Sequence, residues 1–194
     1  MIIWINGAFG SGKTQTAYAL HRRLPGSFVF DPENAGYYLR NNEPLSMQRE
    51  NFQDERLWRF FNLEMLKAIA LDYDGVILVP MTIINSAYYA EIIGGLRNAG
   101  IAVTHFVLSA NRRTLKKRLR KRLEGKRSWA ARQIDSCLAA FSNPLFENRI
   151  DTEQLTITQT AEYIADFCGL TLQKRPPFIK AKFLQLITQL RHIR

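Results

Sequence analysis

The stretch Met1-Ile-Ile-Trp-Ile-Asn-Gly7-Ala-Phe-Gly-Ser-Gly-Lys13-Thr14 decides the fold of this chain. From Gly7 on it fits the pattern G-x-x-x-x-G-K-[ST], in which a glycine-rich loop binds phosphate groups. The residues before Gly7 are mainly apolar and β-branched, which is typical of a short buried strand. The residues after Thr14 repeat apolar side chains at helical spacing as far as Pro25-Gly26. A strand, a glycine loop and a helix in this order predict a site for a nucleoside triphosphate.

The residue types of the loop match the chemistry of phosphate binding. Glycine allows positive φ angles, so that successive backbone N–H groups can converge on an anion, and the following helix N-terminus adds further donors. In such a site the lysine reaches the β- and γ-phosphates and the threonine hydroxyl ligates Mg²⁺. We therefore expect nucleotide contacts from the whole loop, which comprises Gly7, Ala8, Phe9, Gly10, Ser11, Gly12, Lys13 and Thr14.

Length and composition fit one soluble globular domain. The chain has 194 residues, of which 46% are hydrophobic and 23% are charged, as in an ordinary folded protein with a sizeable core. No apolar run approaches the roughly 20 residues that span a bilayer, and no signal peptide precedes the first strand. Cys137 and Cys168 are too few and too isolated to indicate a disulfide framework or a metal site. We expect a cytoplasmic protein.

The positive charge is concentrated in two segments. The net charge of the chain is +10. Residues 112–132 contain eleven Lys and Arg against a single acid, Glu124, so the net charge of this segment equals that of the whole chain. A smaller basic stretch, residues 174–194, has six basic residues and no acid. Proteins that bind along a nucleic-acid backbone carry their charge over a wider surface. We therefore expect no nucleic-acid partner.

Short apolar strands alternate with helical patterns along the chain, which predicts an α/β fold with a parallel sheet. The expected architecture is a three-layer α/β/α sandwich around five parallel strands, at residues 1–6, 27–30, 75–79, 101–108 and 149–151. After the helix that follows the glycine loop, helices are expected at 33–40, 53–72, 85–98, from 111 onward, 128–141 and 158–167. Helix 53–72 should bury a broad apolar face, formed by Leu57, Phe60, Phe61, Leu63, Leu66 and Ile69.

Asp31 ends the second expected strand, at the carboxyl edge where sheets of this kind bind ligands. A carboxylate there can accept the proton of a substrate hydroxyl or hold Mg²⁺ through water. Because Asp-Pro is also a common helix entry, a role as helix cap is open to Asp31 as well. The phosphate loop lies at the same edge, so we favour the functional role. Arg40, at the end of the following helix, is a further candidate for acceptor binding.

The segment from Asn111 to Arg127 predicts a basic helix with a packed stripe of leucines at 115, 119 and 123. Arg118 and Arg122 are four residues apart and share a face beside that stripe. Such a helix, ending in Gly-Lys-Arg, suits a lid over residues 112–132 whose arginines neutralise charge on a transferred phosphoryl group. Two alternatives remain open, a solvated charged face and a helix that binds nucleic acid.

The third expected strand lacks the acidic residue with which many ATPases hold Mg²⁺. Val79 leads into Pro80-Met81-Thr82 instead. This favours a small-molecule kinase, in which Asp31 and Thr14 organise the metal, over a motor or switch ATPase. Met81 and Thr82 would then line the acceptor pocket, although a plain strand-to-helix turn explains them equally well.

The C-terminal segment, residues 174–194, predicts a proline-containing linker followed by a basic amphipathic helix beyond a main domain at 1–173. Its apolar stripe includes Ile179, Phe183, Leu186, Ile187 and Leu190, and Lys180 and Lys182 lie largely off that stripe. Such a helix is typical of a membrane-surface anchor. The alternative, a terminal helix packed on its own domain, carries similar weight, and Leu184 outside the stripe favours a helix with two contacting surfaces.

Four parts of the sequence together resemble the bacterial tunicamycin-resistance proteins: residues 1–14, Val79-Pro-Met-Thr82, the basic helix and Ser128-Trp-Ala-Ala131. The resemblance covers nearly the whole chain. It implies an ATP-binding member of the nucleoside- and shikimate-kinase-like P-loop group, in a family for which membrane association is reported. Lid helices of this group carry Leu-x-x-Arg-Leu-x-x-Arg, matched here from Leu115 to Arg122. The match implies that Arg118 lies against the nucleotide base, and Arg122 and Arg127 near the phosphates.

Together, these features predict an ATP- and Mg²⁺-dependent phosphotransferase that confers resistance to tunicamycin by phosphorylating a hydroxyl. Asp31 is expected to act as the base, and Lys13 and the lid arginines to stabilise charge on the transferred group. The alternative is an ATP-binding protein that sequesters tunicamycin at the inner face of the membrane without modifying it. The expected ligands are ATP, Mg²⁺ and a small-molecule acceptor such as tunicamycin or a related nucleoside or sugar.

Overall fold

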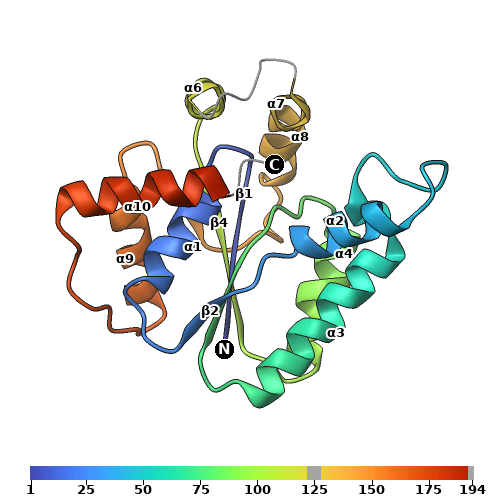
Figure 1. Ribbon diagram of the computed structural model, residues 1–194, viewed down its shortest axis with the longest axis horizontal. Helices are drawn as coiled ribbons and strands as arrows, with labels where there is room; N and C mark the ends of the chain where they lie inside the picture. Colours follow the sequence, from blue (N-terminus) through green and yellow to red (C-terminus); the bar gives the residue numbers. More distant parts are fainter. Residues whose placement is uncertain (122–127, 192–194) are drawn as a thin grey trace.

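The computed structural model describes residues 1–121 and 128–191 and contains the expected parallel sheet (Figure 1). The strands lie in the order β2-β3-β1-β4-β5, and all neighbouring pairs are parallel. Their bounds are β1 Ile2–Gly7, β2 Ser27–Val29, β3 Val76–Pro80, β4 Val103–Ser109 and β5 Arg149–Asp151. Each lies within two residues of its predicted position, so the predicted strands are confirmed.

Helices cover both faces of the sheet, so the predicted three-layer α/β/α sandwich is confirmed (Figure 1). One face carries α1 (Lys13–His21), α9 (Ile157–Phe167) and α10 (Phe178–Arg191). The other carries α2 (Glu33–Asn42), the turn η1 (Phe52–Asp54), α3 (Arg56–Asp72), α4 (Ser86–Tyr89), η2 (Ala90–Gly94) and α5 (Gly95–Asn98). At the carboxyl ends of the strands lie α6 (Arg112–Arg120), α7 (Trp129–Arg132) and α8 (Ile134–Ala140).

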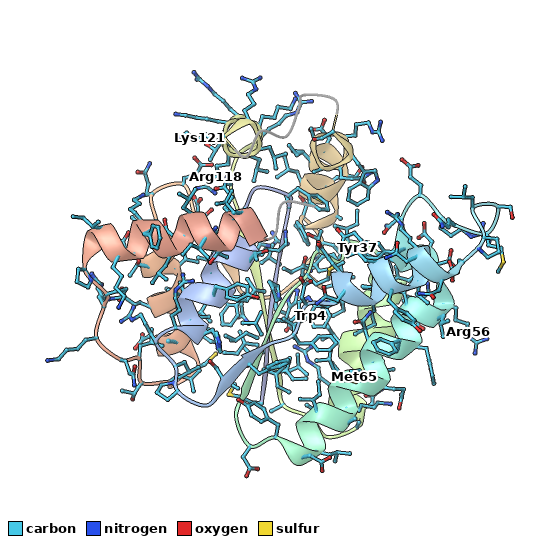
Figure 2. The ribbon with its side chains drawn as sticks, viewed as in Figure 1. Trp4, Tyr37, Arg56, Met65, Arg118 and Lys121 are labelled. Carbon is cyan, nitrogen blue, oxygen red and sulfur yellow. The ribbon has the colours of Figure 1, made fainter. Side chains whose placement is uncertain are left out.

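The alternation of side chains along β1 divides the interior into two hydrophobic cores. Ile2 and Trp4 point into the core beneath α3 and α8, and Ile3 and Ile5 point into the core beneath α1 and α9. All four side chains are fully buried. Trp4 lies at the centre of the molecule (Figure 2), where its indole N–H donates to the Met81 carbonyl at 3.1 Å. The first strand is therefore the wall on which both layers of helices pack.

Three of the predicted helices are less regular than the sequence indicated. The helix predicted at 53–72 begins at Arg56, because residues 52–54 form a separate turn capped by Asn51. The helix predicted at 85–98 contains a π-helical turn, η2, between α4 and α5. The helix predicted at 128–141 consists of α7 and α8 joined at Gln133. Short-range apolar periodicity does not reveal such interruptions, since the side chains before and after them still face the core.

The apolar face predicted for α3 is buried only in part. Leu57, Phe60 and Phe61 are 54%, 57% and 48% exposed, whereas Trp58 and Leu66 are fully buried. The Trp58 indole N–H donates to the Pro32 carbonyl at 3.0 Å, which fixes the rotation of the helix on the sheet. The prediction for these three residues was therefore wrong, because α3 is apolar over most of its circumference and sequence spacing alone did not select the buried side.

The C-terminal helix α10 packs on α1 and leaves a second apolar side exposed. The Gln15 side-chain amide donates to the Gln185 carbonyl at 2.8 Å, and Arg22 donates to the buried Thr188 hydroxyl at 3.1 Å. The exposed side consists of Ile179, Phe183, Leu186 and Leu190. Within the described residues, no helix has both the length and the apolar character required to cross a membrane.

Candidate nucleotide and acceptor site

The glycine loop joins β1 to α1 in the conformation that its sequence predicts. Gly7, Gly10 and Gly12 have φ angles of 140°, 84° and 105°. The backbone of other L-residues rarely adopts such values. The Lys13 ammonium donates to the Gly7 and Ala8 carbonyls at 3.0 and 3.2 Å and lies 5.2 Å from the centre of the Phe9 ring. The lysine is thus held over the loop, at the N-terminus of α1, where an anion would bind.

Asn6 fixes the loop from beneath. Its side-chain oxygen accepts hydrogen bonds from the N–H groups of Gly7 and Ile83, at 2.8 and 3.0 Å, and its amide donates to the Ile83 carbonyl at 2.8 Å. The His105 Nε2 lies 3.1 Å from the same amide. Burial lowers the pKa of His105 to about 4, so the ring is neutral at pH 7 and Nε2 accepts from Asn6. Asn6 therefore connects the end of β1 to the segment that follows β3 and to His105 within β4, behind the loop.

A second chain of hydrogen bonds connects the loop to the other side of the site. The Thr82 hydroxyl, just beyond β3, donates to the Gly7 carbonyl at 2.8 Å. The Gln53 side-chain amide, in η1, donates to the Thr82 carbonyl at 2.7 Å. Gln53 is 6% exposed, so this contact is made inside the protein. The position expected to contact the acceptor, Thr82, thus also links the phosphate loop to η1.

Asp31 lies at the start of α2, directly after β2. Its Oδ1 accepts a hydrogen bond from the Glu33 N–H at 3.1 Å, which is the helix-capping contact that the Asp-Pro sequence allowed. The same side chain lines the cavity beside the loop, as does Glu33. The capping role and a role in the site are thus compatible, because one carboxylate has several acceptor positions.

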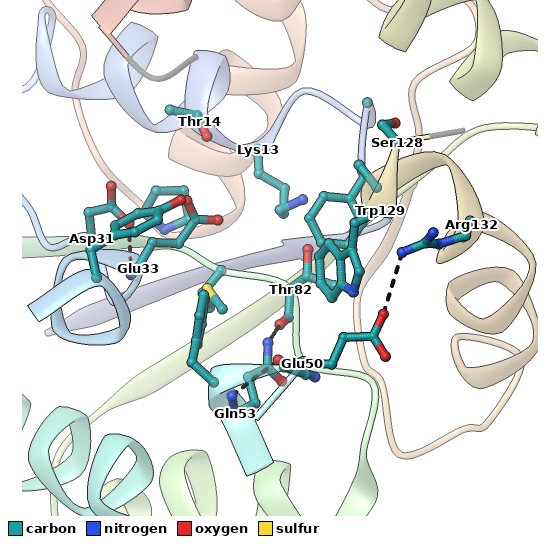
Figure 3. A pocket seen from close by; sticks show the side chains of 18 of the residues that line it. Lys13, Thr14, Asp31, Glu33, Glu50, Gln53, Thr82, Ser128, Trp129 and Arg132 are labelled. Atoms are coloured by element: carbon teal, nitrogen blue, oxygen red, sulfur yellow. Dashed lines mark hydrogen bonds and ion pairs between the residues drawn. The ribbon is translucent and has the colours of Figure 1, made fainter. Parts of the chain in front are cut away.

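A cavity of about 500 Å³ brings these groups together (Figure 3). Its floor is formed by the phosphate loop and the end of β3, and its walls by α2, the residues around η1, and α7. Predicted site residues that line it are Phe9, Gly10, Lys13, Thr14, Asp31, Arg40, Met81 and Thr82. The structure thus places the loop and the four predicted acceptor residues around one space, of the size that binds a small organic molecule.

Aromatic side chains form much of the wall of the cavity. Trp129 of α7 meets the Phe9 ring edge to face, with centres 5.0 Å apart. Arg40 lies over the Phe52 ring at 5.5 Å and donates to the Glu50 carbonyl at 2.6 Å. The Arg40 guanidinium therefore orders the segment that leads into η1, a role that the sequence did not indicate.

Of the three lid arginines predicted to contact the nucleotide, Arg118 lies within the described residues. Its guanidinium donates to the Thr152 carbonyl and hydroxyl, at 2.7 and 3.0 Å, and reaches the Ser11 carbonyl at 3.5 Å. Leu115 and Leu119 of the same helix are buried against the loop at Gly10. Arg118 therefore stands beside the phosphate loop, on the side away from Asp31. Arg122 and Arg127, the other two predicted lid arginines, lie outside the described residues.

The thiol of Cys137 lies behind the loop and has no place in the chemistry. Burial raises its pKa to about 11, so it is neutral and a poor nucleophile at pH 7. Cys137 is fully buried and packs within the core beneath α3 and α8, as expected for a small apolar residue.

The donor groups of the cavity suit Mg²⁺ better than a transition metal. Mg²⁺ binds through one or two oxygen ligands of the protein together with phosphate oxygens and water, and Thr14 and Asp31 supply such oxygens here. In residues 1–121 and 128–191, no group of three His, Cys, Asp or Glu side chains is placed to hold a metal ion. The residues present thus fit a metal that arrives with a nucleotide.

The chain matches the model of the AAA domain family over residues 2–144. The tunicamycin resistance protein of Deinococcus radiodurans is 35% identical, and the match covers 90% of this chain and 99% of that one, with a TM-score of 0.76. The fold and the glycine loop show that this chain is a kinase-like P-loop protein. The chain belongs to the AAA domain family and to the family of tunicamycin-resistance proteins.

More distant structures share the fold. The Mycobacterium tuberculosis APS kinase CysC, solved in complex with AMPPNP and APS, is 22% identical over 87% of this chain and 96% of its own, with a TM-score of 0.59. A sugar kinase from Janibacter sp. HTCC2649 is 19% identical over 88% and 95%, with a TM-score of 0.64. The search of curated proteins gave no match.

Proposed function

We propose that this protein is an ATP-dependent phosphotransferase that phosphorylates a hydroxyl of tunicamycin or of a related nucleoside or sugar. The observation that carries the proposal is the cavity in which Lys13 and Thr14 of the phosphate loop share one space with the Asp31 carboxylate. A phosphate-binding loop supplies the donor side of a transfer, and a carboxylate at the adjacent strand end supplies a proton acceptor. Kinases share the fold, and the family is named for tunicamycin resistance.

The chemistry assigned to the residues is a single displacement. The acceptor hydroxyl gives its proton to Asp31 while its oxygen forms a bond to the γ-phosphorus of ATP. The bond between that phosphorus and the bridging oxygen breaks, and ADP leaves with the electron pair. Lys13 would leave the Gly7 and Ala8 carbonyls and neutralise charge on the phosphates. Thr14 and, through water, Asp31 would hold Mg²⁺, which supplies charge neutralisation at the phosphates.

The acceptor side of the cavity suits a ring-containing polar molecule. Tyr37, Phe52 and Trp129 supply aromatic surface, and Gln53 and Arg132 supply polar groups beside it. Mixed aromatic and polar walls of this kind bind nucleosides and sugars through stacking and a few directed hydrogen bonds. Tunicamycin, a nucleoside antibiotic with free sugar hydroxyls, has this chemistry.

The test is mass spectrometry of tunicamycin after incubation with the protein, ATP and Mg²⁺. The expected product carries one added phosphate and accumulates over many turnovers, and ADP forms in equal amount. A reaction with Lys13→Ala serves as the control and should form product at least about 10²-fold more slowly, because charge neutralisation at the phosphates is lost. Unmodified tunicamycin that stays bound to the protein would instead support sequestration.

A contact with the membrane surface is favoured by the exposed side of α10. Ile179 and Phe183 are 83% and 61% exposed, and the same helix carries Lys180 and Lys182 but no acid. We expect the protein to float with vesicles that contain an anionic lipid, because apolar side chains enter the interface while lysines contact headgroups. Replacing both Phe183 and Leu186 by Glu should abolish flotation.

The matched control for α10 is Tyr163→Glu, on an exposed part of α9. It adds one negative charge away from α10 and should leave flotation unchanged, whereas Phe183→Glu alone, which adds the same single charge on α10, should weaken it. Equal binding by the α10 double variant and the wild type would rule out this helix as the membrane contact.

A further inference from the structure

The exposed side of α3 is a continuous apolar strip. It consists of Leu57, Phe60, Phe61, Met65, Ala68 and Leu71, which we call the α3 apolar face; its five large side chains are between 43% and 80% exposed. Their spacing of three and four residues places them on one side of the helix along its whole length. Single exposed apolar residues are ordinary, but a contiguous patch of this kind marks a binding surface.

The opposite side of α3 is fixed in the interior of the protein. Trp58 and Leu66 are fully buried on the opposite side, and Asn62, also buried, donates to the Trp58 carbonyl at 2.8 Å. Turning the α3 apolar face inward would expose Trp58 and break its bond to Pro32. The face is therefore a surface feature of the folded protein.

The charges beside the α3 apolar face distinguish it from the lipid-binding type of surface. Arg56 and Asp72 are exposed at its two ends, and Glu64 and Lys67 form an ion pair of 2.8 Å near its middle. These four charges sum to zero, whereas surfaces that bind anionic lipid carry an excess of Lys and Arg. The helix also lies on the flank of the molecule opposite α10 (Figure 1), so the two helices cannot rest on the same flat membrane.

We propose that the α3 apolar face binds a second copy of this chain in a twofold-symmetric dimer. In an antiparallel pair of α3 helices centred on Glu64, Leu57 of each copy lies at the height of Leu71 of the other. The large Phe60 lies at the height of the small Ala68 in the same way, so this bulky side chain faces a small one across the interface. In a twofold-symmetric dimer the same residues of both copies form the interface, so the surface must be complementary to itself.

The charges support the same arrangement. Antiparallel pairing places the Arg56 end of one helix at the height of the Asp72 end of the other, so the charges at each end of the pair are opposite in sign. Figure 2 shows Arg56 at the outer edge of the molecule, where a partner can reach it. The two Glu64 carboxylates approach the axis, and each is neutralised by Lys67 of its own helix.

The size of the surface sets the expected strength. A helix of 17 residues is about 25 Å long, and one helix pair buries less than the roughly 800 Å² per partner of a standard interface. We therefore expect a weak dimer with a dissociation constant in the micromolar range. The dimer does not depend on the proposed phosphotransfer, since α3 lines no part of the cavity.

The experiment is sedimentation equilibrium of the full chain from about 1 to 200 µM. The wild type is expected to shift from monomer to dimer across this range, and Phe61→Glu to remain monomeric throughout, because a charged side chain replaces a large apolar one in the middle of the interface. Tyr163→Glu, which adds the same charge on α9, should dimerise like the wild type. Thermal unfolding of each variant shows whether its fold is intact.

Exchanging the charges at the two ends of α3 tests whether the partner on the α3 apolar face is a second copy of this chain or another molecule. Arg56→Asp alone should raise the dissociation constant about 3- to 10-fold, and adding Asp72→Arg to the same chain should restore it, because the charges at each end of the pair are again opposite in sign. A wild type that stays monomeric at 200 µM would overturn the proposal, as would a dimer that Phe61→Glu leaves unchanged.

Discussion

Replacing Asp31 by Asn is expected to lower kcat for phosphorylation of the acceptor by about 10²–10⁴-fold, the usual contribution of a general base. The affinity for ATP should change less than about twofold, because the phosphate loop is untouched and the asparagine oxygen can still accept from a water bound to Mg²⁺. Asparagine keeps an oxygen that can accept from the Glu33 N–H, as Asp31 Oδ1 does at 3.1 Å, so the start of α2 is preserved. Calorimetric ATP titration and acceptor turnover measure the two quantities separately.

Glu33→Gln is the matched control, because Glu33 is the second carboxylate of the same wall of the cavity. It should reduce turnover less than about tenfold, below the usual range for a general base. If Asp31→Asn retained full turnover while Glu33→Gln abolished it, the base would be Glu33 and the assignment of Asp31 would be wrong.

Replacing Gly7 by Ala is expected to destabilise the fold by about 2–5 kcal/mol and to weaken ATP binding more than about tenfold. The added Cβ would lie 2.5 Å from the Leu108 carbonyl oxygen, and φ at this position is 140°. Leu108 belongs to β4, which is paired on both sides, so its backbone cannot move away. Any shift must be taken by the phosphate loop itself. Urea unfolding and ATP titration measure the two effects.

Two other glycines provide a graded comparison. Gly100 has a φ of 77° and open space around its Cβ position, so Gly100→Ala should cost only the strain, about 1–2 kcal/mol. Gly94 has helical φ and open space, and Gly94→Ala should stabilise by about 0.5–1 kcal/mol. Equal unfolding free energies for Gly7→Ala and Gly94→Ala would show that neither the contact nor the strain at Gly7 matters.

The sheet and the phosphate loop could be predicted from the sequence because their signals are local. Residues 1–14 contain a whole strand, a loop with fixed glycine positions and a helix start, and each interaction spans a few residues. The buried side of α3 depended on a contact from Trp58 to Pro32, 26 residues away. Apolar side chains around most of the helix left that choice to tertiary packing.

The residues that hold the site in place through hydrogen bonds could not be predicted from the sequence for the same reason. Asn6 bonds to Ile83, 77 residues away, and Gln53 bonds to Thr82, 29 residues away. One signal for Asn6 was available, a polar residue closing an apolar strand directly before the glycine loop. Gln53 gave none, since an amide in a polar segment is usually solvated. The position of Asp31 beside the loop could be predicted, because the end of a strand in such a sheet is where ligands bind.

The hydrogen bonds from Gly7 through Thr82 to Gln53 have a thermodynamic consequence. They connect the loop that would hold the donor to the segment that would hold the acceptor. A shift of either segment therefore displaces the other. Linkage is reciprocal: whatever factor ATP contributes to the affinity for the acceptor, the acceptor contributes to the affinity for ATP. A Thr82→Val variant, which removes the hydroxyl, would bring that factor closer to one.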